Sequence, residues 1–349
     1  MEKKRWDWKR HADNPMTKAY EGQHHGHEWG SANPELRLIG DTYHLYYHGF
    51  PELEDYPRVQ TPNLPRGIAQ KSGICLAQCK TSDFDGFHWD WYEHNPIVRW
   101  GEEGAFDANH IYDPSTAYFK GKYWMYYSAL GPDSDGAEEF NLMGMASSED
   151  GLHWTKHPEP VMEGRGPEAL VHDDVLYVFS SKDHGESMNA APHGKRSYWK
   201  GGWFNITLAK STDGIHFTPQ EDQPLVLPHG RGGEWDSHSV AAPAIWPEDD
   251  WWYMLYVGDH EHHDAHEGFG LARSKDLHEW EKNPANPVFL PSYDPEACDG
   301  EMVFWPEVLK KGGTYYLWYE GIGYPSLPEG RVPRIAMATL EADSMWEGI

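Results

Sequence analysis

Cysteine is scarce in this chain. Its 349 residues contain only Cys75, Cys79 and Cys298, and no two of these form a C-x-x-C pair. Because an odd number leaves one thiol unpaired in any connectivity, the sequence does not indicate a disulfide framework. This cysteine usage is typical of a reducing compartment.

Long apolar runs are also missing. No stretch approaches the roughly 18 apolar residues of a membrane span, and the charged segment 1–10 lacks the apolar core of a signal peptide. We therefore predict a cytoplasmic protein that has no membrane partner.

Positive charge is the third deficit. Lys and Arg number 29 against 56 Asp and Glu, which gives a formal net charge of −27. Such a surface repels phosphate backbones, so nucleic acid is not an expected partner. The chain also lacks a P-loop, a nucleotide-binding glycine fingerprint and a nucleophile elbow, and no cofactor is expected.

Aromatic residues, by contrast, are abundant, with 18 Trp and 20 Tyr. An excess of this kind is typical of proteins that stack on sugar rings. Many of these rings recur at equivalent positions of a repeat, however, so we expect most of them to pack between sheets.

The dominant pattern is that internal repeat. A proline opens an apolar stretch that runs into a Gly- and Tyr-rich hairpin at Pro34, Pro114, Pro167, Pro243 and Pro306. The units start 80, 53, 76 and 63 residues apart, close to the ~40–50 residues of a four-stranded propeller blade once loop insertions are counted. The sequence therefore predicts an all-β protein, a single domain over residues 1–349 that forms a five-bladed β-propeller. Each blade is expected to have four antiparallel strands, and a funnel should lie on the axis.

The outer half of the units carries a second recurring signal. Asp-Gly stands at residues 85–86, 150–151 and 213–214, and after one further residue come His and then Trp or Phe. The fourth unit has Asp276-Leu277 instead. Asp-Gly is typical of tight hairpins whose glycine has positive φ.

The fifth unit lacks the outer strand that follows these turns elsewhere. The chain stops three residues after Trp346, whereas Trp8 stands seven residues ahead of Pro15 in the outer-strand pattern. We predict that residues 1–16 supply the outer strand of the last blade and close the ring.

Carboxylates beside the five prolines are the candidates for chemistry. Asp113 precedes a proline, and Glu35, Glu168 and Glu307 each follow one. Since alternate residues of a strand share a face, all four are expected to face the funnel, where like charges shift one another's pKa. They are the predicted catalytic residues, although a Glu after Pro also serves to pair with an Arg or to cap a turn.

Three further aspartates recur at one offset, seven residues before the proline. Asp107, Asp236 and Asp299 are therefore predicted to have a turn or capping role.

The sequence around the second proline resembles a known group of enzymes. Tyr112–Ser115 (YDPS), followed by Lys120–Ser128 (KGKYWMYYS) and the repeated Asp-Gly-x-His-Trp turns, resembles the five-bladed propeller glycosidases of families 43, 32 and 117. The likeness covers nearly the whole chain and is more specific for fold than for activity. It implies an acid triad at the starts of the first three inner strands, two Asp directly before proline and a Glu just ahead of one.

This chain departs from that triad. Asp113 matches the second acid, whose usual role in the family is to tune the proton donor and orient the substrate. The first position is Asn33, which is no carboxylate base, and the third blade has Arg165 at the expected offset, between Glu163 and Glu168. The departure implies a divergent family that uses Glu35, Glu168 or Glu307 instead.

A second resemblance concerns the fifth unit. Phe304–Glu307 (FWPE) resembles a segment of the family 130 mannoside phosphorylases, which share the propeller. Those enzymes need a cationic phosphate site, and the candidates here are Arg165, His110, His238 and Arg231. The net charge of −27 disfavours phosphate binding, because a negatively charged protein repels an anion. The predicted substrate-binding residues are Asn33, His110, Arg165, His238, Trp305 and Trp199.

Two insertions contain further candidates. Trp199 stands with Tyr198 and Trp203 in a long connection of the third unit, where the rings suit either sugar stacking or a loop core. His260–Glu267 (HEHHDAHE) has the composition of a metal site, but neither a helix nor a Cys sets ligand spacing. No metal is predicted, and a solvated or substrate-facing loop is expected.

These observations predict a glycoside hydrolase, exo-acting on an oligosaccharide, that uses a carboxylic acid and a carboxylate across the glycosidic bond. Two alternatives stay open: a catalytically inactive carbohydrate-binding propeller, in which loss of the first Asp marks loss of catalysis, and a phosphorylase similar to family 130.

Overall fold

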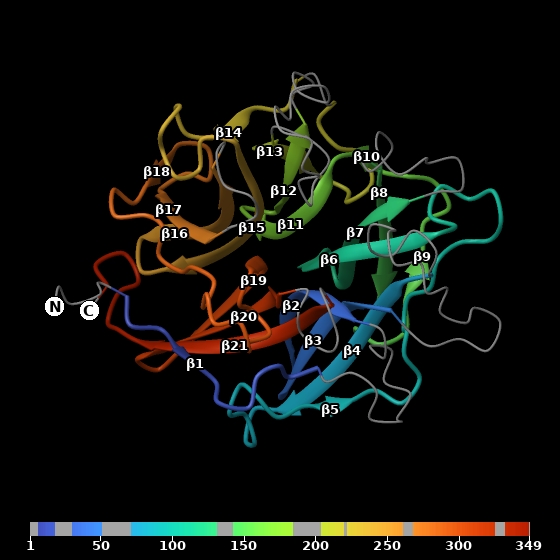
Figure 1. Cartoon of the computed structure of the whole chain (residues 1–349). Coiled ribbons are helices and arrows are strands. Elements are labelled where there is room, and N and C mark those ends of the chain that lie inside the picture. The colour runs from blue at the N-terminus through green and yellow to red at the C-terminus, as the bar shows by residue number, and fades with distance from the viewer. Residues whose placement is uncertain are drawn as a thin grey trace, which may run out of the picture.

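The computed structural model describes residues 6–17, 30–50, 71–130, 142–183, 204–219, 222–260, 268–324 and 332–348. The regular elements in these ranges are β-strands, grouped into five antiparallel sheets around a common axis (Figure 1). The predicted all-β, five-bladed propeller is confirmed.

Each blade runs outward from an inner strand. Blade one has β2 (Ser31–Ile39), β3 (Thr42–Gly49), β4 (Gly73–Lys80) and β5 (Asp90–Trp91). Blade two has β6 (His110–Phe119), β7 (Lys122–Leu130) and β8 (Leu142–Ser148), and both β9 (Thr155–Lys156) and β10 (Met162–Glu163) pair with β8. Its sheet therefore contains five strands rather than the four expected.

Blade three has β11 (Arg165–His172), β12 (Val175–Asp183), β13 (Phe204–Ser211) and β14 (Leu225–Leu227). Blade four has β15 (Ser239–Glu248), β16 (Trp251–Asp259), β17 (Gly268–Ser274) and β18 (Trp280–Lys282). Blade five has β19 (Met302–Lys311), β20 (Thr314–Ile322), β21 (Pro333–Glu341) and β1 (Lys9–Arg10). The inner strands β2, β6, β11, β15 and β19 contact one another in a ring around the axis.

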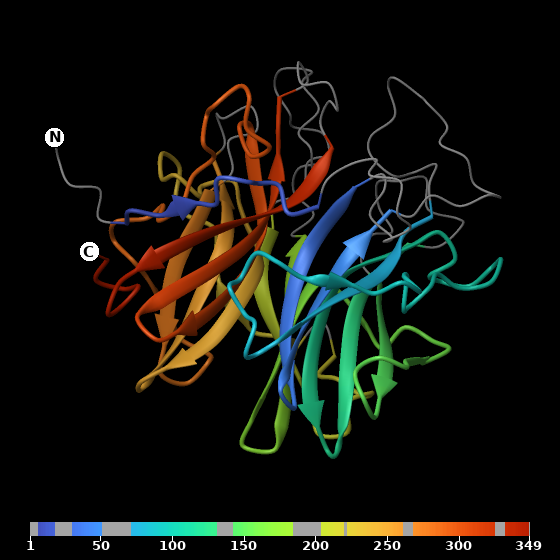
Figure 2. The same cartoon turned by 90° about the horizontal axis from the view of Figure 1, so that it is seen from below.

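The N-terminal segment closes this ring, as predicted. Strand β1 pairs antiparallel with β21, with Lys9 opposite Thr339, and Figure 2 shows it lying along that strand. Beyond β1, Met16 N donates to Ile335 O at 2.8 Å, and the Trp6 indole donates to Met345 O at 2.8 Å. Blade five therefore combines strands from the two ends of the chain.

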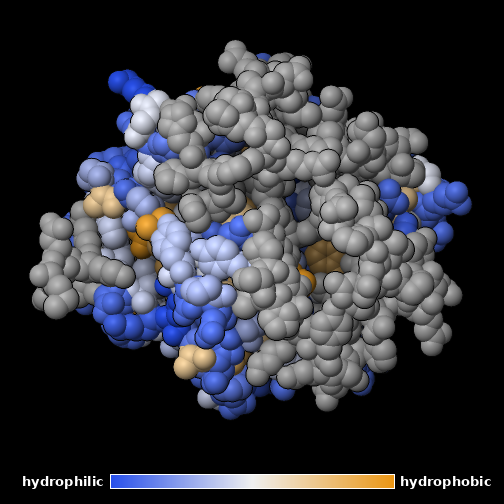
Figure 3. Space-filling view, in the orientation of Figure 1, coloured by the Kyte–Doolittle hydropathy of each residue, from blue (hydrophilic) through white to orange (hydrophobic). Residues whose placement is uncertain are grey.

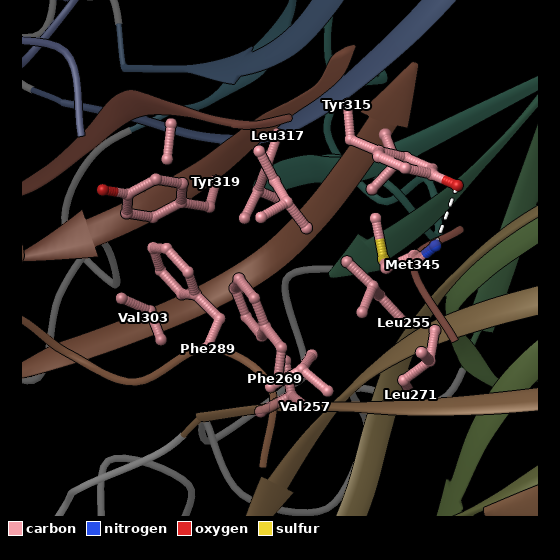
Figure 4. Close-up of a cluster of buried hydrophobic side chains, with 14 of the residues drawn as sticks. Leu255, Val257, Phe269, Leu271, Phe289, Val303, Tyr315, Leu317, Tyr319 and Met345 are labelled. Carbon is pink, nitrogen blue, oxygen red and sulfur yellow. Dashed lines mark hydrogen bonds between the residues drawn. The ribbon is translucent and has the colours of Figure 1, made fainter. Parts of the chain in front are cut away.

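The hydrophobic core is divided among the interfaces between blades. Five clusters of buried residues each join two neighbouring blades, and Figure 4 shows the one between blades four and five, where Phe269 and Phe289 stack with ring centroids 5.5 Å apart. Tyr46, Tyr126 and Trp318 are among the fully buried side chains. The expectation that recurring aromatic residues pack between sheets is confirmed for them.

The three aspartates seven residues before the prolines link the second strand to the outer strand in blades two, four and five. Asp107, Asp236 and Asp299 each accept a hydrogen bond from a buried tyrosine of the second strand and pair with a cation of the outer strand. The cations are Lys156, Lys282 and Arg10. Arg10 comes from β1, so the N-terminal segment reproduces the contact that the outer strands make in blades two and four.

The tight turns of the outer halves have the predicted conformation. φ is 89° at Gly86, 74° at Gly151 and 85° at Gly214, and Leu277 takes the same place in blade four with φ of 66°. The aspartate before each of these residues accepts backbone N–H groups through its Oδ1, for example from Phe87 at 2.8 Å.

On the face that Figure 3 shows, the described residues are mainly hydrophilic, in line with the excess of Asp and Glu. Within the described ranges no helix is long and apolar enough to span a bilayer.

Candidate functional site

A β-bulge at the proline interrupts every inner strand. The pairing between inner and second strand shifts across it in all five blades, for example between Tyr112 and Ser115. The residue before each proline has left-handed φ, which is 52° at Asn33, 53° at Asp113, 57° at Gly166, 48° at Ala242 and 48° at Trp305. Non-glycine residues in this region are uncommon and cluster at functional sites.

The bulge divides the side chains around the axis into two sets. The pre-proline set consists of the residues directly before the prolines, and the post-proline set of the residues directly after them. The post-proline set comprises Glu35, Ser115, Glu168, Ala244 and Glu307.

Four members of the post-proline set link neighbouring blades. Glu35 Oε1 accepts a hydrogen bond from Thr116 N at 2.8 Å, and Glu168 Oε1 accepts one from Ile245 N at 2.9 Å. Ser115 Oγ accepts from Ala169 N at 2.9 Å, and Glu307 accepts from the backbone of Leu36. In each case the donor lies two residues after the proline of the next blade, and Ala244 has no side-chain oxygen to do the same.

Strand alternation groups Asp113 with the three glutamates, but a bulge lies between the two positions in the structure. The bulge inserts an extra residue and turns the backbone between the positions before and after the proline. The glutamates bind backbone groups of the neighbouring blade, whereas Asp113 has separate partners.

The three glutamates lie close enough to affect one another's pKa, with Glu35 and Glu168 buried and Glu307 half-buried. Burial, together with the charge of the neighbouring Glu35, raises the pKa of Glu168 to about 8. Burial also raises the pKa of Glu307, with added effects of Glu35 and Glu168. The Arg37 guanidinium lies 3.3 Å from Glu35 Oε1 and opposes the rise in the pKa of Glu35 that burial causes. Glu35 thus has the arginine pairing that the sequence left open as its alternative role.

Asp113 is the member of the pre-proline set that has a carboxyl group. Its carboxyl group is buried, with Ser128 Oγ donating to Oδ2 at 2.8 Å, and the same Oγ accepts from Gly166 N at 2.9 Å. Burial, together with the charge of Glu320, raises the pKa of Asp113 to about 7, and the Ser128 hydrogen bond and Arg165 limit the rise. At neutral pH a large share of the Asp113 side chains is therefore protonated and able to donate a proton.

A small pocket, partly open to solvent, lies where blades three, four and five meet. Its walls include Arg165, Phe204, His238, Asp259 and Trp305. The Arg165 guanidinium stacks over the Phe204 ring at 4.1 Å, and His238 Nδ1 lies 3.0 Å from Asp259 Oδ2. The structure thus brings together three of the predicted substrate-binding residues, Arg165, His238 and Trp305.

The other binding candidates lie elsewhere. His110 is buried against Ser72 Oγ at 3.0 Å, and burial, with a contribution from Lys71, lowers its pKa to about 3. A neutral His110 does not offer a phosphate group the positive charge that the sequence analysis assigned to it. Arg231 and Glu163 are exposed and do not line the pocket.

Trp199, its neighbours Tyr198 and Trp203, and residues 261–267 of the histidine-rich stretch fall outside the described residues. Among the residues that the structure does describe, no group of three or more His, Cys, Asp or Glu side chains is arranged to hold a metal ion.

Sequence reasoning missed the second-strand residues that face the pre-proline set. His48, Ser128 and Glu320 each lie 14 residues after the blade proline and pair across the ladder with the residue two before it. Ser181 and Val257 occupy this place in blades three and four. Because these residues always stand 14 positions after the proline, an alignment of the five units on their prolines could have identified them.

Comparisons with solved structures agree with this architecture. A β-1,2-mannobiose phosphorylase from Listeria innocua, solved with β-1,2-mannobiose, has a TM-score of 0.67 at 16% identity, over 96% of this chain and 97% of that one. A second structure represents the family 130 mannoside phosphorylases, described as containing hydrolases of β-1,2 mannosidic linkages in Candida mannan. It has a TM-score of 0.68 at 15% identity, over 98% of this chain and 97% of that one.

A thermostable family 43 glycoside hydrolase has a TM-score of 0.60 at 18% identity, over 88% of both chains. No family model and no curated protein matches the sequence. The structural neighbours are thus propeller glycoside hydrolases and phosphorylases, the group that the sequence resembles. At these identities the likeness establishes the shared fold.

Proposed function

We propose that this protein is a glycoside hydrolase whose proton donor is Asp113. The observation that carries the proposal is a buried carboxyl group, at a backbone position with left-handed φ beside the axis, whose pKa of about 7 leaves it partly protonated at neutral pH. Enzymes that cleave glycosidic bonds need such an acid to protonate the departing oxygen.

Glu320 is the proposed partner carboxylate. Glu320 is buried on β20 and pairs across the ladder with Phe304, the residue before Trp305. Its charge raises the pKa of Asp113. In the reaction Asp113 donates its proton to the glycosidic oxygen, while Glu320 takes a proton from a water molecule that attacks the anomeric carbon. This assignment moves the chemistry from the post-proline glutamates, whose oxygens hold backbone groups, to the pre-proline side of the bulge.

Phosphorolysis is the second candidate, because Arg165 and His238 line one pocket. A guanidinium with a neighbouring imidazole suits a phosphate that replaces water as the attacking group. His238 is already paired with Asp259, and a carboxylate in the wall opposes an anion. Hydrolysis is therefore the first choice.

The test is a screen of aryl glycosides and plant and marine oligosaccharides for released reducing ends, run with and without inorganic phosphate. Cleavage without phosphate is expected. Cleavage only with phosphate, together with a sugar 1-phosphate product, would establish the phosphorylase instead. If sugars bind but are not cleaved in either condition, the protein is a carbohydrate-binding propeller without catalytic activity.

A further inference from the structure

Blade one carries a pair of polar side chains whose hydrogen-bonding capacity is only half used. Asn33, before the proline, and His48, 14 residues after it, are 5% and 8% exposed. His48 Nδ1 lies 3.2 Å from Asn33 Oδ1. Because an amide oxygen only accepts, the proton of this bond resides on Nδ1, which leaves His48 Nε2 as an acceptor.

The surroundings keep this imidazole neutral. It lies between aromatic rings, with centroids 4.4 Å from Phe50 and 5.7 Å from Tyr112. Burial, reinforced by His110, lowers the pKa of His48 to about 3. At neutral pH His48 Nε2 therefore carries a lone pair and no proton.

Two buried atoms of the pair have no hydrogen-bond partner within the described part of the chain. They are His48 Nε2, an acceptor, and Asn33 Nδ2, a donor. Leaving such atoms unsatisfied is costly, and native proteins seldom do so without a ligand or an ordered water.

The position of the pair points to the ligand. In the ring of inner strands β2 lies between β6 and β19, so Asn33 stands between the blades that carry Asp113 and Glu320. Tyr112, whose ring packs near His48, directly precedes Asp113. A substrate held between the two proposed catalytic carboxylates would therefore lie beside the strand that carries Asn33.

We propose that Asn33 and His48 form a subsite that recognises one hydroxyl group of the sugar. That hydroxyl donates to His48 Nε2 and accepts from Asn33 Nδ2. A hydroxyl both donates and accepts, whereas a carboxylate has no proton to donate and an ammonium group has no lone pair to accept with. The inference rests on the proposed function for the identity of its ligand, and it gives the Asn at the family's first acid position a recognition role.

The test is a binding measurement that does not depend on turnover. The methyl glycosides of D-mannose, D-galactose, D-xylose and L-arabinose, each with its set of monodeoxy analogues, are titrated by calorimetry into the wild type, His48→Phe and Asn33→Asp. Phe keeps a ring between Phe50 and Tyr112, and Asp tolerates the φ of 52° at position 33 while it removes the donor. His44→Phe is the control, a buried histidine of the same strand that bonds Gln78 at 3.1 Å.

In the wild type and in His44→Phe, loss of one particular hydroxyl should weaken binding about 10-fold, as expected for a neutral hydrogen bond in a buried site. In His48→Phe and Asn33→Asp the parent sugar should bind about 10-fold more weakly, and removal of that hydroxyl should then have no further effect. An equal parent-to-deoxy ratio in all four proteins, as expected if the pair holds only a water, overturns the subsite. Absence of binding by every sugar overturns it as well.

A second measurement needs no variant for its readout and so stays valid if a variant folds poorly. It is the ¹⁵N NMR spectrum of the histidine imidazoles in the wild type. The subsite requires a neutral, Nδ1-protonated His48 at pH 7 whose Nε2 resonance moves when the binding sugar is added. A His48 resonance that ignores the sugar contradicts the subsite. If the protein cleaves glycosides but the effect of removing a hydroxyl is the same with and without His48, the subsite is wrong and the proposed enzymatic function stands. If that effect depends on His48 but no glycoside is cleaved, the subsite stands and the proposed enzymatic function is wrong.

Discussion

At the scale of single residues, the backbone conformation before a blade proline separates similar side chains into different roles. Asp113 has φ of 53° and bonds Ser128, whereas Glu168, which follows its proline, bonds a backbone N–H of the next blade. Both carboxyl groups have raised pKa values because both are buried. Only Asp113, which lies beside Arg165 of the pocket wall, is assigned to the chemistry.

Asp113→Asn should lower turnover by roughly 10²–10⁴, the range for loss of acid–base assistance, with little change in stability because the amide keeps the shape. In the wild type kcat/KM should fall as pH rises through about 7, since Asp113 must be protonated to donate. Steady-state kinetics across pH 5 to 9 check both points. Asp41→Asn, an exposed carboxylate that pairs with Lys80, is the control. Wild-type turnover in Asp113→Asn would remove this residue from the mechanism.

At the scale of the strand, the post-proline side chains join inner strands that share no ladder with one another. Each inner strand pairs with the second strand of its own blade, so the link between neighbouring inner strands depends on side chains. Ser115 illustrates this, because its Oγ accepts from Ala169 N at 2.9 Å and donates to Glu168 Oε2 at 3.2 Å. Blade four does without such a link, since Ala244 occupies the position.

Ser115→Ala should reduce the free energy of unfolding by about 1–3 kcal/mol, because it leaves the Ala169 N–H buried without its acceptor. Ser115→Thr keeps the hydroxyl and is the comparison variant. Urea denaturation gives the difference. If Ala and Thr variants have equal stability, the inter-blade bond contributes nothing measurable.

At the scale of the whole molecule, closure of the ring depends on the N-terminal segment. Trp6 is buried in the cluster between blades four and five, β1 pairs with β21, and Arg10 reaches Asp299 at 2.5 Å. These contacts cover the outer edge of blade five, which otherwise exposes the unpaired backbone of β21.

Deletion of residues 1–16 should lower the melting temperature by roughly 10 °C or more, since loss of one buried Trp alone costs about 3–5 kcal/mol. Deletion of residues 1–5 leaves Trp6 and β1 in place and is the matched control. Differential scanning calorimetry gives the melting temperatures of the two truncated proteins for comparison. Equal melting temperatures would mean that the segment does not close the ring energetically.

The buried glutamates also give the molecule a characteristic pH dependence. The pKa of Glu168 is raised to about 8 from an ordinary value of 4.5, so the folded state binds this proton more tightly than the unfolded state does. The resulting stability is fully present below pH 4.5 and is lost as pH rises toward 8, by at most about 1.4 kcal/mol per pH unit. Glu168→Gln should flatten this decline in urea midpoints measured from pH 5 to 9. A parallel decline in both proteins would assign it to other groups.

The sequence by itself determined the architecture of this protein. Prolines, hairpins, Asp-Gly turns and aspartates recur at fixed offsets, and a repeated pattern reports the shared environment of equivalent positions. The closure by residues 1–16 was readable for the same reason, because Trp8 and Pro15 repeat a spacing that the fifth unit lacks. Local turn chemistry and strand periodicity suffice for inferences of this kind.

Only the tertiary structure decided which residues meet at the axis. Strand alternation predicts that residues on both sides of a proline share a face, but a left-handed residue at each bulge breaks the alternation. Residues 14 positions after the prolines enter the site through ladder pairing, and Arg165, His238 and Trp305 converge from three blades. Such contacts depend on how separate sheets are oriented around the axis, which is a property of the packed ring and of no single unit.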